Sequence, residues 1–317
     1  MLTSKTNERA RGSLEGVANP VWRDRASLTD REETGMDIAV LGMGRMGRAL
    51  AARLLEGGHS VTVWNRSKGK AAEIVSAGGR EVSSVADAVD GVDVVITMLA
   101  NDGAVREVAL GELRPSIGDK TIYVDCSTVS PKLSGELAEA FPAHFLALPV
   151  LGSPLAVRAG QAIYLTGGNA GLVDHLAPVL ASLSNTVRRY DTEPLALAAK
   201  LTTNLLLLSQ IVALAESFAV GRAGGLTDDQ LRELLGNSPL VAGLKNRFEG
   251  VLTGSQDGWW SPALGAKDAG LAIDIACGAD VELPVAQVVQ GLYDKAAASG
   301  LDDIADVTEL YQGPDTR

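Results

Sequence analysis

Cysteine, histidine and aromatic side chains are scarce in this chain. The two cysteines, Cys126 and Cys277, stand far apart, which excludes a framework of disulfides and fits a reducing, cytoplasmic compartment. The three histidines, His59, His144 and His175, lack the spacing and the cysteine neighbours of a metal site, so no bound metal is expected. Aromatic residues make up only 4% of the chain, so its core should be mainly aliphatic.

Positive charge is also in short supply. The chain has 28 lysines and arginines against 39 acidic residues, a net charge of −11 that argues against electrostatic binding of nucleic acid. The longest charge-free part of its most apolar segment, residues 201–215, contains five polar side chains and is too short to cross a bilayer. We therefore expect a cytoplasmic protein with neither a nucleic-acid nor a membrane partner.

The chain of 317 residues divides into four segments by its patterns. Residues 1–35 carry six basic and six acidic side chains and few large apolar ones, which predicts a disordered tail. Strands and helices alternate over residues 36–193, which predicts an α/β domain with a doubly wound parallel sheet of the Rossmann type. Residues 194–225 predict one long helix between domains or subunits, and residues 226–317 predict an all-helical C-terminal domain.

The long predicted helix is apolar on nearly every face. Such a helix needs other protein surface to cover it on every side. Symmetric dimers are the commonest way to supply that cover, so we expect a homodimer.

A glycine motif follows the first predicted strand and opens a helix. Gly42, Gly44 and Gly47 form G-x-G-x-x-G, in which the first glycine permits a tight turn and the second lets a pyrophosphate approach the backbone. The third lets the helix pack closely on the strand, and the helix N-terminus attracts the phosphates. The motif predicts a dinucleotide site. The residues between the glycines are candidates for the same site: Met43, Arg45 and Met46.

The end of the second predicted strand indicates which dinucleotide binds. NAD sites usually carry Asp or Glu there, to bond the ribose 2′-hydroxyl. This chain has Asn65, Arg66 and Ser67, with Lys70 close behind, and no carboxylate that would repel a 2′-phosphate. An arginine can bind a phosphate through two parallel hydrogen bonds, and a serine hydroxyl can donate a hydrogen bond to it. We therefore predict NADP(H) in preference to NAD(H).

A lysine interrupts the apolar run "LALAAKLTTNLLLLS". On a helix, Lys200, Thr203 and Asn204 share one face through their spacing of three and four residues. A lone lysine in this setting usually packs its stem against apolar neighbours while its amine reaches water. A catalytic amine is the other interpretation, and the rest of the chain decides between them.

Five stretches together resemble the β-hydroxyacid dehydrogenase family, which includes 3-hydroxyisobutyrate dehydrogenase and the glyoxylate and succinic semialdehyde reductases. The resemblance covers about residues 36–311. It rests on the following stretches: "GMGRMG" (42–47), "VDCSTVSP" (124–131), "PVLGSPLAVRAGQAIYLTGG" (149–168), "KLTTN" (200–204) and "LGAKDAGLA" (264–272).

The family implies roles at the matching positions. Lys200 matches its catalytic lysine and Asn204 the asparagine one turn further on. Thr128 matches a residue near the nicotinamide. Leu99 lies where the chain leaves the predicted strand at 92–100, against the cofactor. Lys267 matches the C-terminal lysine that reaches back to the cofactor site. Met98 and Ser127 flank these positions and are further candidates for the cofactor site. Trp260 stands where relatives often have a phenylalanine in the substrate pocket.

The substrate loop departs from the family pattern D-A-P-V-S-G-G. Ala147 replaces the aspartate, Leu151 the serine and Ser153 the second glycine, while Gly152 is kept. Leu151, Gly152 and Ser153 are the substrate-binding candidates of this loop. Further on, Thr203 replaces the first asparagine of K-x-x-N-N. The resemblance therefore implies the cofactor and the catalytic lysine but not the identity of the substrate.

The resemblance implies an oxidoreductase that interconverts a β-hydroxy acid, or a related alcohol, with its aldehyde or ketone. A protonated Lys200 would polarise the carbonyl oxygen and donate the proton, and its neutral form would act as the base in the reverse direction. Two alternatives remain. An imine reductase shares the architecture but usually lacks this lysine, and a non-catalytic NADPH-binding protein would not need Lys200 and Asn204.

Overall fold

Nine strands form a single sheet in the computed structural model, which describes residues 35–255 and 258–311. The described residues belong to one compact unit that begins at Glu33. The tail predicted for residues 1–35 lies, apart from Gly35, outside the described residues. The strands are β1 (Asp37–Leu41), β2 (Ser60–Trp64), β3 (Arg80–Glu81), β4 (Val94–Thr97), β5 (Ile122–Asp125), β6 (Phe145–Ala147), β7 (Val150–Leu151), β8 (Ile163–Gly168) and β9 (Val187–Tyr190).

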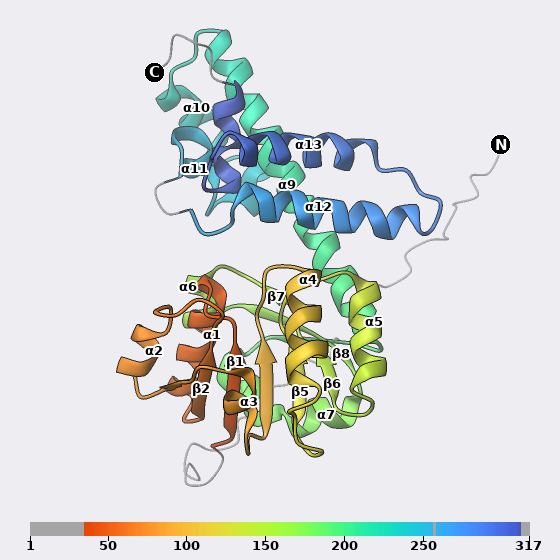
Figure 1. The fold of residues 1–317 in the computed structure, drawn as a ribbon. Coiled ribbons are helices and arrows are strands. Elements are labelled where there is room, and N and C mark those ends of the chain that lie inside the picture. Colours follow the sequence, from red (N-terminus) through yellow and green to blue (C-terminus); the bar gives the residue numbers. More distant parts are fainter. Residues whose placement is uncertain (1–34, 256–257, 312–317) are drawn as a thin grey trace, which may run out of the picture. The chain divides into compact units, whose positions relative to one another are not determined.

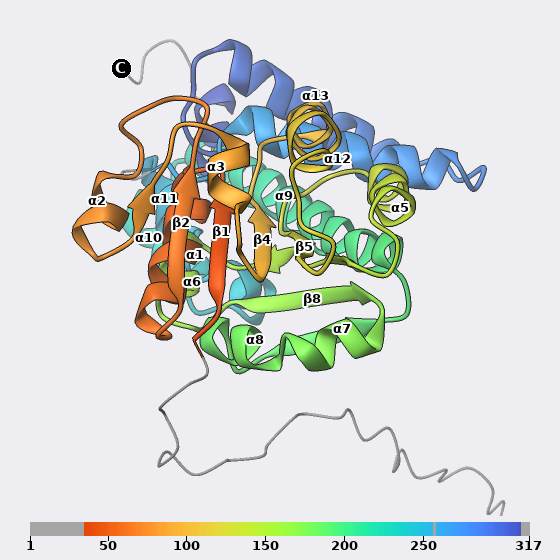
Figure 2. The same cartoon turned by 60° about the horizontal axis from the view of Figure 1, so that its bottom comes forward.

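The strand order confirms the predicted doubly wound sheet. It runs β3-β2-β1-β4-β5-β6-β8-β7, with β9 paired to β8 (Figures 1 and 2). Strands β1 to β6 run parallel to one another, and β1 lies between β2 and β4. The chain reverses its winding direction between β1 and β4, which makes the carboxyl ends of these two strands the place where a ligand is expected.

The sheet is not parallel throughout. β8 runs antiparallel to both β6 and β7, which the sequence patterns did not predict. A parallel return needs a crossover of a dozen or more residues, whereas the segment 152–162 that connects β7 to β8 is shorter than that. The chain therefore turns back as a hairpin, and the predicted substrate loop lies in that turn.

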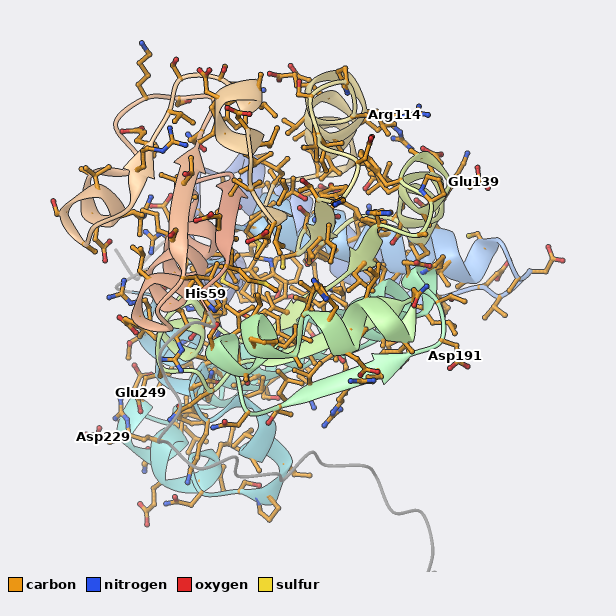
Figure 3. The ribbon with its side chains drawn as sticks, turned by 90° about the horizontal axis from the view of Figure 1, so that it is seen from below. His59, Arg114, Glu139, Asp191, Asp229 and Glu249 are labelled. Atoms are coloured by element: carbon orange, nitrogen blue, oxygen red, sulfur yellow. The ribbon has the colours of Figure 1, made fainter. Side chains whose placement is uncertain are left out.

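Helices cover both faces of the sheet. The flanking elements are α1 (Arg45–Glu56), α2 (Ala72–Ser76), α3 (Val85–Val89), α4 (Asp102–Val105), the π-helix η1 (Arg106–Leu113), α5 (Pro131–Ala140), α6 (Pro154–Arg158), α7 (Ala170–His175) and α8 (Ala177–Leu183). Alternate residues of the strands point into two separate hydrophobic cores, one on each face of the sheet. Ile38 and Val40 face the core under α1, whereas Ala39 and Leu41 face the core under α5. Charged side chains such as the labelled Arg114, Glu139 and Glu249 lie at the periphery (Figure 3).

Helix α9 (Glu193–Ala223) confirms the long helix predicted after the sheet. Its length and composition would suffice to cross a membrane, so the expectation that no segment is long enough was too strict. The helix nevertheless packs against β8 and α5 near its start and against α12 further on. It buries the polar side chains of Lys200 and Asn204 there, as the core helix of a globular unit does.

From α9 onward the described residues contain helices and no strand, as predicted. Apolar side chains of the second half of α9 form a third core with these helices. The helices are α10 (Asp228–Leu235), η2 (Pro239–Leu244), α11 (Phe248–Thr253), α12 (Pro262–Cys277), α13 (Pro284–Ala298) and η3 (Ile304–Tyr311). The boundaries proposed for a separate helical domain stay a prediction.

Candidate active site

The three glycines of the motif lie where β1 turns into α1, and each has a different reason to lack a side chain. Gly42 has a φ of +109°, and a Cβ there would lie 2.4 Å from the Met98 carbonyl oxygen. A Cβ on Gly47 would lie 1.8 Å from the oxygen of Gly42, which shows how closely helix and turn pack. A Cβ on Gly44 would meet nothing within 4 Å, so space next to this backbone is open.

The N-terminus of α1 fits a bound pyrophosphate. Gly44 begins the helix without a side-chain cap, and no acidic residue occupies the first turn. The exposed backbone of Gly44 and Arg45 and the helix dipole are therefore available to an anion. Met46 is half-buried, and the side chain of Met43 is fully buried in the core. The backbone N–H of Met43 donates to Asn65 and its carbonyl oxygen accepts from Arg48, so Met43 has a structural role in this turn.

Asn65 connects the glycine turn to the end of β2. Its Oδ1 accepts a hydrogen bond from Met43 N at 2.9 Å, and its Nδ2 donates to Ser67 O at 2.7 Å. The amide thus holds the two loops together instead of pointing to solvent. The predicted phosphate-binding side chains Arg66, Ser67 and Lys70 are all exposed beside it.

The loops after β4 and β5 are bonded to each other at the same end of the sheet. Leu99 N donates to Ser127 Oγ at 2.9 Å. Met98 and Leu99 are half-buried, and the loop packs against the glycine turn through the Met98 carbonyl. The structure therefore brings the predicted cofactor residues of β1, β4 and β5 to one edge. It adds Lys267 from α12, whose Nζ donates to Thr128 O at 2.7 Å.

Asp268 joins the predicted catalytic residues of α9 to those of α12. Asn204 Nδ2 donates to Asp268 Oδ2 at 2.7 Å, and Lys267 Nζ lies 2.9 Å from Asp268 Oδ1 in an ion pair without hydrogen-bond geometry. Asp268 and Asn204 are both buried. The carboxylate therefore fixes the amide of Asn204 and compensates part of the local positive charge.

The Lys200 side chain is only 8% exposed and makes no hydrogen bond or ion pair within the described part of the chain. Burial lowers the pKa of Lys200 to about 8, Asp268 opposes this shift, and the positive charge of Lys267 adds to it. An amine with a pKa near neutrality exchanges a proton readily in both directions. A buried amine with a lowered pKa suits the predicted role of Lys200 as a general acid–base group.

The predicted substrate residues form a less complete set. Gly152 has a φ of +148°, and Leu151 is half-buried against the core under α5. Ser153 begins α6, and its Oγ accepts a hydrogen bond from Ala156 N at 3.2 Å. This hydroxyl therefore has a structural role that the sequence did not reveal. Trp260 is half-buried and packs against the core of the helical segment.

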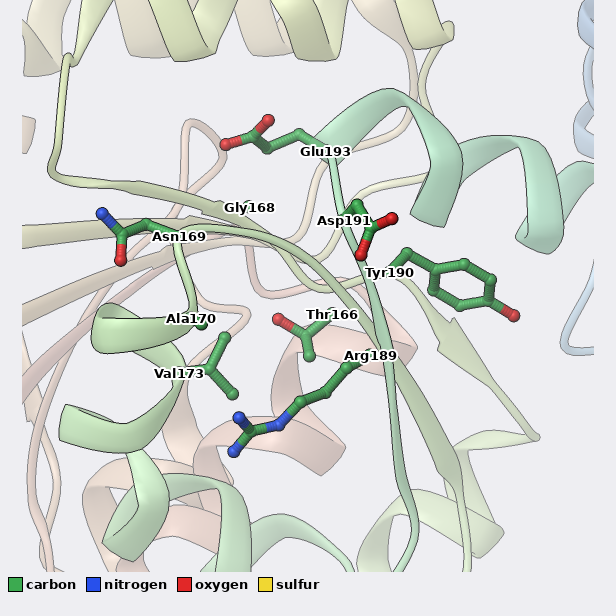
Figure 4. Close-up of a pocket in the computed structure, with 9 residues that line it drawn as sticks. All are labelled: Thr166, Gly168, Asn169, Ala170, Val173, Arg189, Tyr190, Asp191 and Glu193. Atoms are coloured by element: carbon green, nitrogen blue, oxygen red, sulfur yellow. The ribbon is translucent and has the colours of Figure 1, made fainter. Parts of the chain in front are cut away.

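Two cavities of about 520 Å³ each lie at the opposite end of the sheet. The cavity in Figure 4 is lined by the C-terminal ends of β8 and β9, including Thr166 and Arg189, and by the starts of α7 and α9, including Glu193. The other lies at the N-terminal ends of β1 and β2. Neither is lined by a predicted site residue, so both are separate from the candidate active site.

Asp268 is the functional candidate that the sequence reasoning missed. It directly follows Lys267 in the stretch "LGAKDAGLA", where it is one of two charges among apolar residues. The same kind of signal singled out Lys200, since a charge in an apolar helix needs a partner. The partner, Asn204, is 64 residues away and could not be assigned from spacing.

Comparisons with known proteins agree with this geometry. A family model described as the NAD binding domain of 6-phosphogluconate dehydrogenase matches residues 37–191. A second, described as NAD-binding of NADP-dependent 3-hydroxyisobutyrate dehydrogenase, matches residues 196–313. An uncharacterised oxidoreductase of Bacillus subtilis is 34% identical over 280 residues, which are 85% of this chain and 96% of that protein. The 3-hydroxyisobutyrate dehydrogenase of Pseudomonas aeruginosa is 29% identical over 296 residues, 88% of this chain and 99% of that protein.

Solved structures show the same similarity. A 3-hydroxyisobutyrate dehydrogenase of Mycobacterium tuberculosis, solved with L-serine, has a TM-score of 0.76 and 26% identity, and the match covers 88% of this chain and 100% of that one. An imine reductase of Streptomyces aurantiacus has a TM-score of 0.59 and 19% identity, with 87% and 100% covered, which is a likeness of fold alone.

Proposed function

This chain belongs to the β-hydroxyacid dehydrogenase family, and we propose that it interconverts a β-hydroxy acid, or a related alcohol, with its aldehyde or ketone, using NADP(H) in preference to NAD(H). Its class is that of a NAD(P)-dependent hydroxyacid dehydrogenase or reductase. The observation that supports the finer assignment is the buried Lys200 amine, whose pKa is lowered to about 8 beside Asn204 and Asp268.

Reduction of a carbonyl requires a hydride on carbon and a proton on oxygen. A bound dinucleotide would supply the hydride, and the backbone of Gly44 and the N-terminus of α1 would hold its pyrophosphate. The protonated Lys200 amine polarises the carbonyl oxygen and then donates the proton to it. For oxidation of the alcohol the amine must first be neutral, so oxidation is expected to rise, and reduction to fall, as the pH passes about 8.

Asn204 and Asp268 orient the substrate oxygen. One N–H of the Asn204 amide is held by Asp268, which fixes the plane of the amide. The other N–H is left to donate to a carbonyl oxygen, and the amide oxygen can accept from a substrate hydroxyl. Leu197 and Leu201, which lie next to Lys200 on α9, are buried, and such apolar surroundings strengthen polar contacts.

Replacement of Lys200 by alanine tests the proposed mechanism. We expect turnover of the carbonyl substrate to fall by roughly 10²–10⁴-fold, the usual range for loss of a general acid–base group, while the dissociation constant of NADPH changes little. Steady-state kinetics and fluorescence titration of NADPH measure the two quantities. Unchanged turnover, or a loss confined to cofactor binding, would remove Lys200 from the mechanism.

Arg66 supports the preference for NADP(H). Its side chain is 78% exposed and is contacted by Glu107 at 3.7 Å, a pair of exposed charges that contributes little to stability. The guanidinium is therefore available to a 2′-phosphate. Arg66→Ala is expected to weaken the binding of NADPH by about 1.5–3 kcal/mol, the range for hydrogen bonds to a charged group, and to leave the binding of NADH almost unchanged.

Arg114→Ala is the matched control, since Arg114 is an exposed arginine at the end of η1. It should change the dissociation constants of NADPH and NADH only slightly and by the same factor. Equal losses for NADPH and NADH in the Arg66 variant would mean that Arg66 does not bind the 2′-phosphate.

A panel of short aldehyde acids, 2-oxo acids, β-hydroxy acids and cyclic imines separates the proposed activity from its alternatives. NADPH consumption with carbonyl acids supports a hydroxyacid dehydrogenase, whereas turnover of imines alone would indicate an imine reductase. Tight NADPH binding without turnover of any compound would indicate a non-catalytic binding protein. The half-buried Leu151 at the position of the usual serine favours substrates with a larger or less polar tail than glyoxylate.

A further inference from the structure

A carboxylate lies buried between the loops that carry the candidate cofactor residues. Asp125 ends β5, and its side chain is only 2% exposed. Its Oδ1 accepts two hydrogen bonds, from Thr97 Oγ1 at 2.7 Å and from Ser127 N at 3.1 Å. The proposed reaction assigns no part to this charge.

The bonds around Asp125 have a fixed direction. An ionised carboxylate only accepts hydrogen bonds, so the Thr97 hydroxyl must donate to it. That hydroxyl lies 2.9 Å from the Tyr123 hydroxyl, which must then donate to Thr97 Oγ1 in turn. The negative charge therefore orders a buried chain of hydroxyl groups that runs from Tyr123 through Thr97, the last residue of β4, to Asp125.

The same charge acts on the cofactor edge through Ser127. Ser127 N donates to Asp125, and Ser127 Oγ accepts the hydrogen bond of Leu99 N. The segment that contains Leu99 packs against the glycine turn, where the Met98 carbonyl leaves no room for a side chain on Gly42. Asp125 is thus connected through Ser127 and the loop after β4 to three of the predicted cofactor-binding segments.

Asp125 has no cationic neighbour within the described part of the chain. The titratable groups that face it are Asp102 at the start of α4, Tyr123 on the same strand and Cys126 directly after it. A buried charge without an ion pair is costly, and it is tolerated where the hydrogen bonds that it makes are needed. Burial raises the pKa of Asp125 to about 6, and hydrogen bonds from Ser127 and Thr97 limit the rise.

We propose that Asp125 is a positioning residue of the cofactor site: its ionised carboxylate holds the loops after β4 and β5 together, so that Leu99, Thr128 and the glycine turn present one surface to the dinucleotide. This inference rests on the proposed function, because it requires that a dinucleotide binds at this edge. It predicts that cofactor affinity depends on the charge of Asp125, although Asp125 itself does not touch the cofactor.

Asp125→Asn separates the charge from the shape of the side chain. The amide oxygen can still accept from Thr97 and Ser127, but as a neutral and weaker acceptor. A neutral amide is also easier to bury than a carboxylate, so the melting temperature at pH 8 should stay the same or rise. A residue with only a structural role would lose stability and affinity together.

The measurement is calorimetric titration of the full chain with NADP⁺, and with NAD⁺ as second ligand, at several pH values from 5 to 8. At each pH the dissociation constant of Asp125→Asn is divided by that of the wild type. The titration of the cofactor's own 2′-phosphate affects both constants equally and therefore drops out of this ratio. Asp125 is protonated at pH 5 and ionised at pH 8. The ratio should therefore rise from about 1 at pH 5 to roughly fivefold at pH 8, the difference between a neutral and a charged acceptor.

Thr97→Val and Thr121→Val form a matched pair of variants. Both remove a buried hydroxyl from the β4–β5 region, but Thr121 lies at the opposite end of β5, where it donates to Val92 O at 2.8 Å. Thr97→Val should raise the dissociation constant of NADP⁺ several-fold at pH 8, and Thr121→Val should leave it unchanged.

Each outcome of these titrations decides the proposal. A ratio that does not change with pH, or equal losses of affinity in the two threonine variants, would overturn it while leaving the proposed function intact. A wild-type chain that binds neither NADP⁺ nor NAD⁺ would overturn the proposed function and this inference with it.

Discussion

Asp268 is one of the groups that determine the pKa of Lys200. Burial favours the neutral amine, and the carboxylate of Asp268 favours the protonated one. The pKa of about 8 is the balance of these two effects and of the positive charge of Lys267, which lowers it further. A side chain that never touches the substrate can therefore determine the pH at which the enzyme reduces its carbonyl substrate.

Asp268→Asn should shift the pH profile of the reduction to lower pH. The amide oxygen can still accept from Asn204, but the negative charge that raises the pKa of Lys200 is lost. Reduction needs the protonated amine, so kcat/KM for the carbonyl substrate should begin to fall at a lower pH than in the wild type. Profiles of kcat/KM against pH measure this shift.

Asp274→Asn is the control for that experiment. Asp274 lies on the same helix α12, but its side chain is exposed and solvent screens its charge. Its removal should leave the profile unchanged. Coincident profiles for wild type and Asp268→Asn would show that Asp268 does not act on Lys200 electrostatically.

At the scale of elements, the turn between β1 and α1 distinguishes glycines needed for folding from a glycine needed for binding. Gly44→Ala should fold normally, because its Cβ meets nothing within 4 Å and its φ of −66° suits any residue. The methyl group would, however, occupy the space of the pyrophosphate. We expect NADPH to bind at least about tenfold more weakly, as for loss of a hydrogen bond to a charged group.

Gly47→Ala is the contrasting variant. Its Cβ would lie 1.8 Å from the Gly42 oxygen, so helix and strand must separate, at a cost of about 2 kcal/mol or more in the free energy of unfolding. Thermal melts and NADPH titrations of both variants check the two expectations. Loss of stability in Gly44→Ala, or normal stability in Gly47→Ala, would contradict this assignment of roles.

The elements best predicted from the sequence are those whose signals are local. β1, β2 and α9 follow from apolar runs bounded by glycine, charge or Pro194, and their observed bounds differ little from the expected ones. The direction of β8 could not be predicted, because it depends on the path of the chain through residues 152–162.

The candidate site divides in the same way. Lys200 and Asn204 share a helix, so their spacing alone places them together. Asp268 and Asp125 act through partners on other elements, and the N-cap role of Ser153 depends on where α6 begins. Such contacts exist only after the elements have packed, and no short stretch of sequence encodes them.

At the scale of the whole molecule, α9 retains an apolar stripe without a cover. Leu206 is 61% and Val220 is 74% exposed. Thr202, Ala213 and Ser217 are exposed on the same face of the helix. Exposed apolar surface that continues along a helix commonly marks a contact with another protein, and a second copy of this chain is the partner we expect.

Light scattering at micromolar concentration should therefore give the mass of a dimer. The double substitution Leu206→Glu and Val220→Glu should shift the mass to that of a monomer, because it places like charges in the contact. Val75→Glu, a similar change at an exposed position of α2, should leave the dimer intact. A monomeric wild type would exclude the dimer, and a dimer that survives the double substitution would exclude this face.

The pairing of Asn204 with Asp268 also has a consequence for how the chain is made. The two residues are 64 positions apart, and ribosomes add about 5–20 residues per second, so roughly 3–13 s pass between the synthesis of one and of the other. All nine strands precede α9 and can pair during this delay. The part of the predicted cofactor edge that β1, β4 and β5 provide can thus form on the nascent chain before Lys267 and Asp268 are made, so the contact between Asn204 and Asp268 is one of the last parts of the candidate site to form.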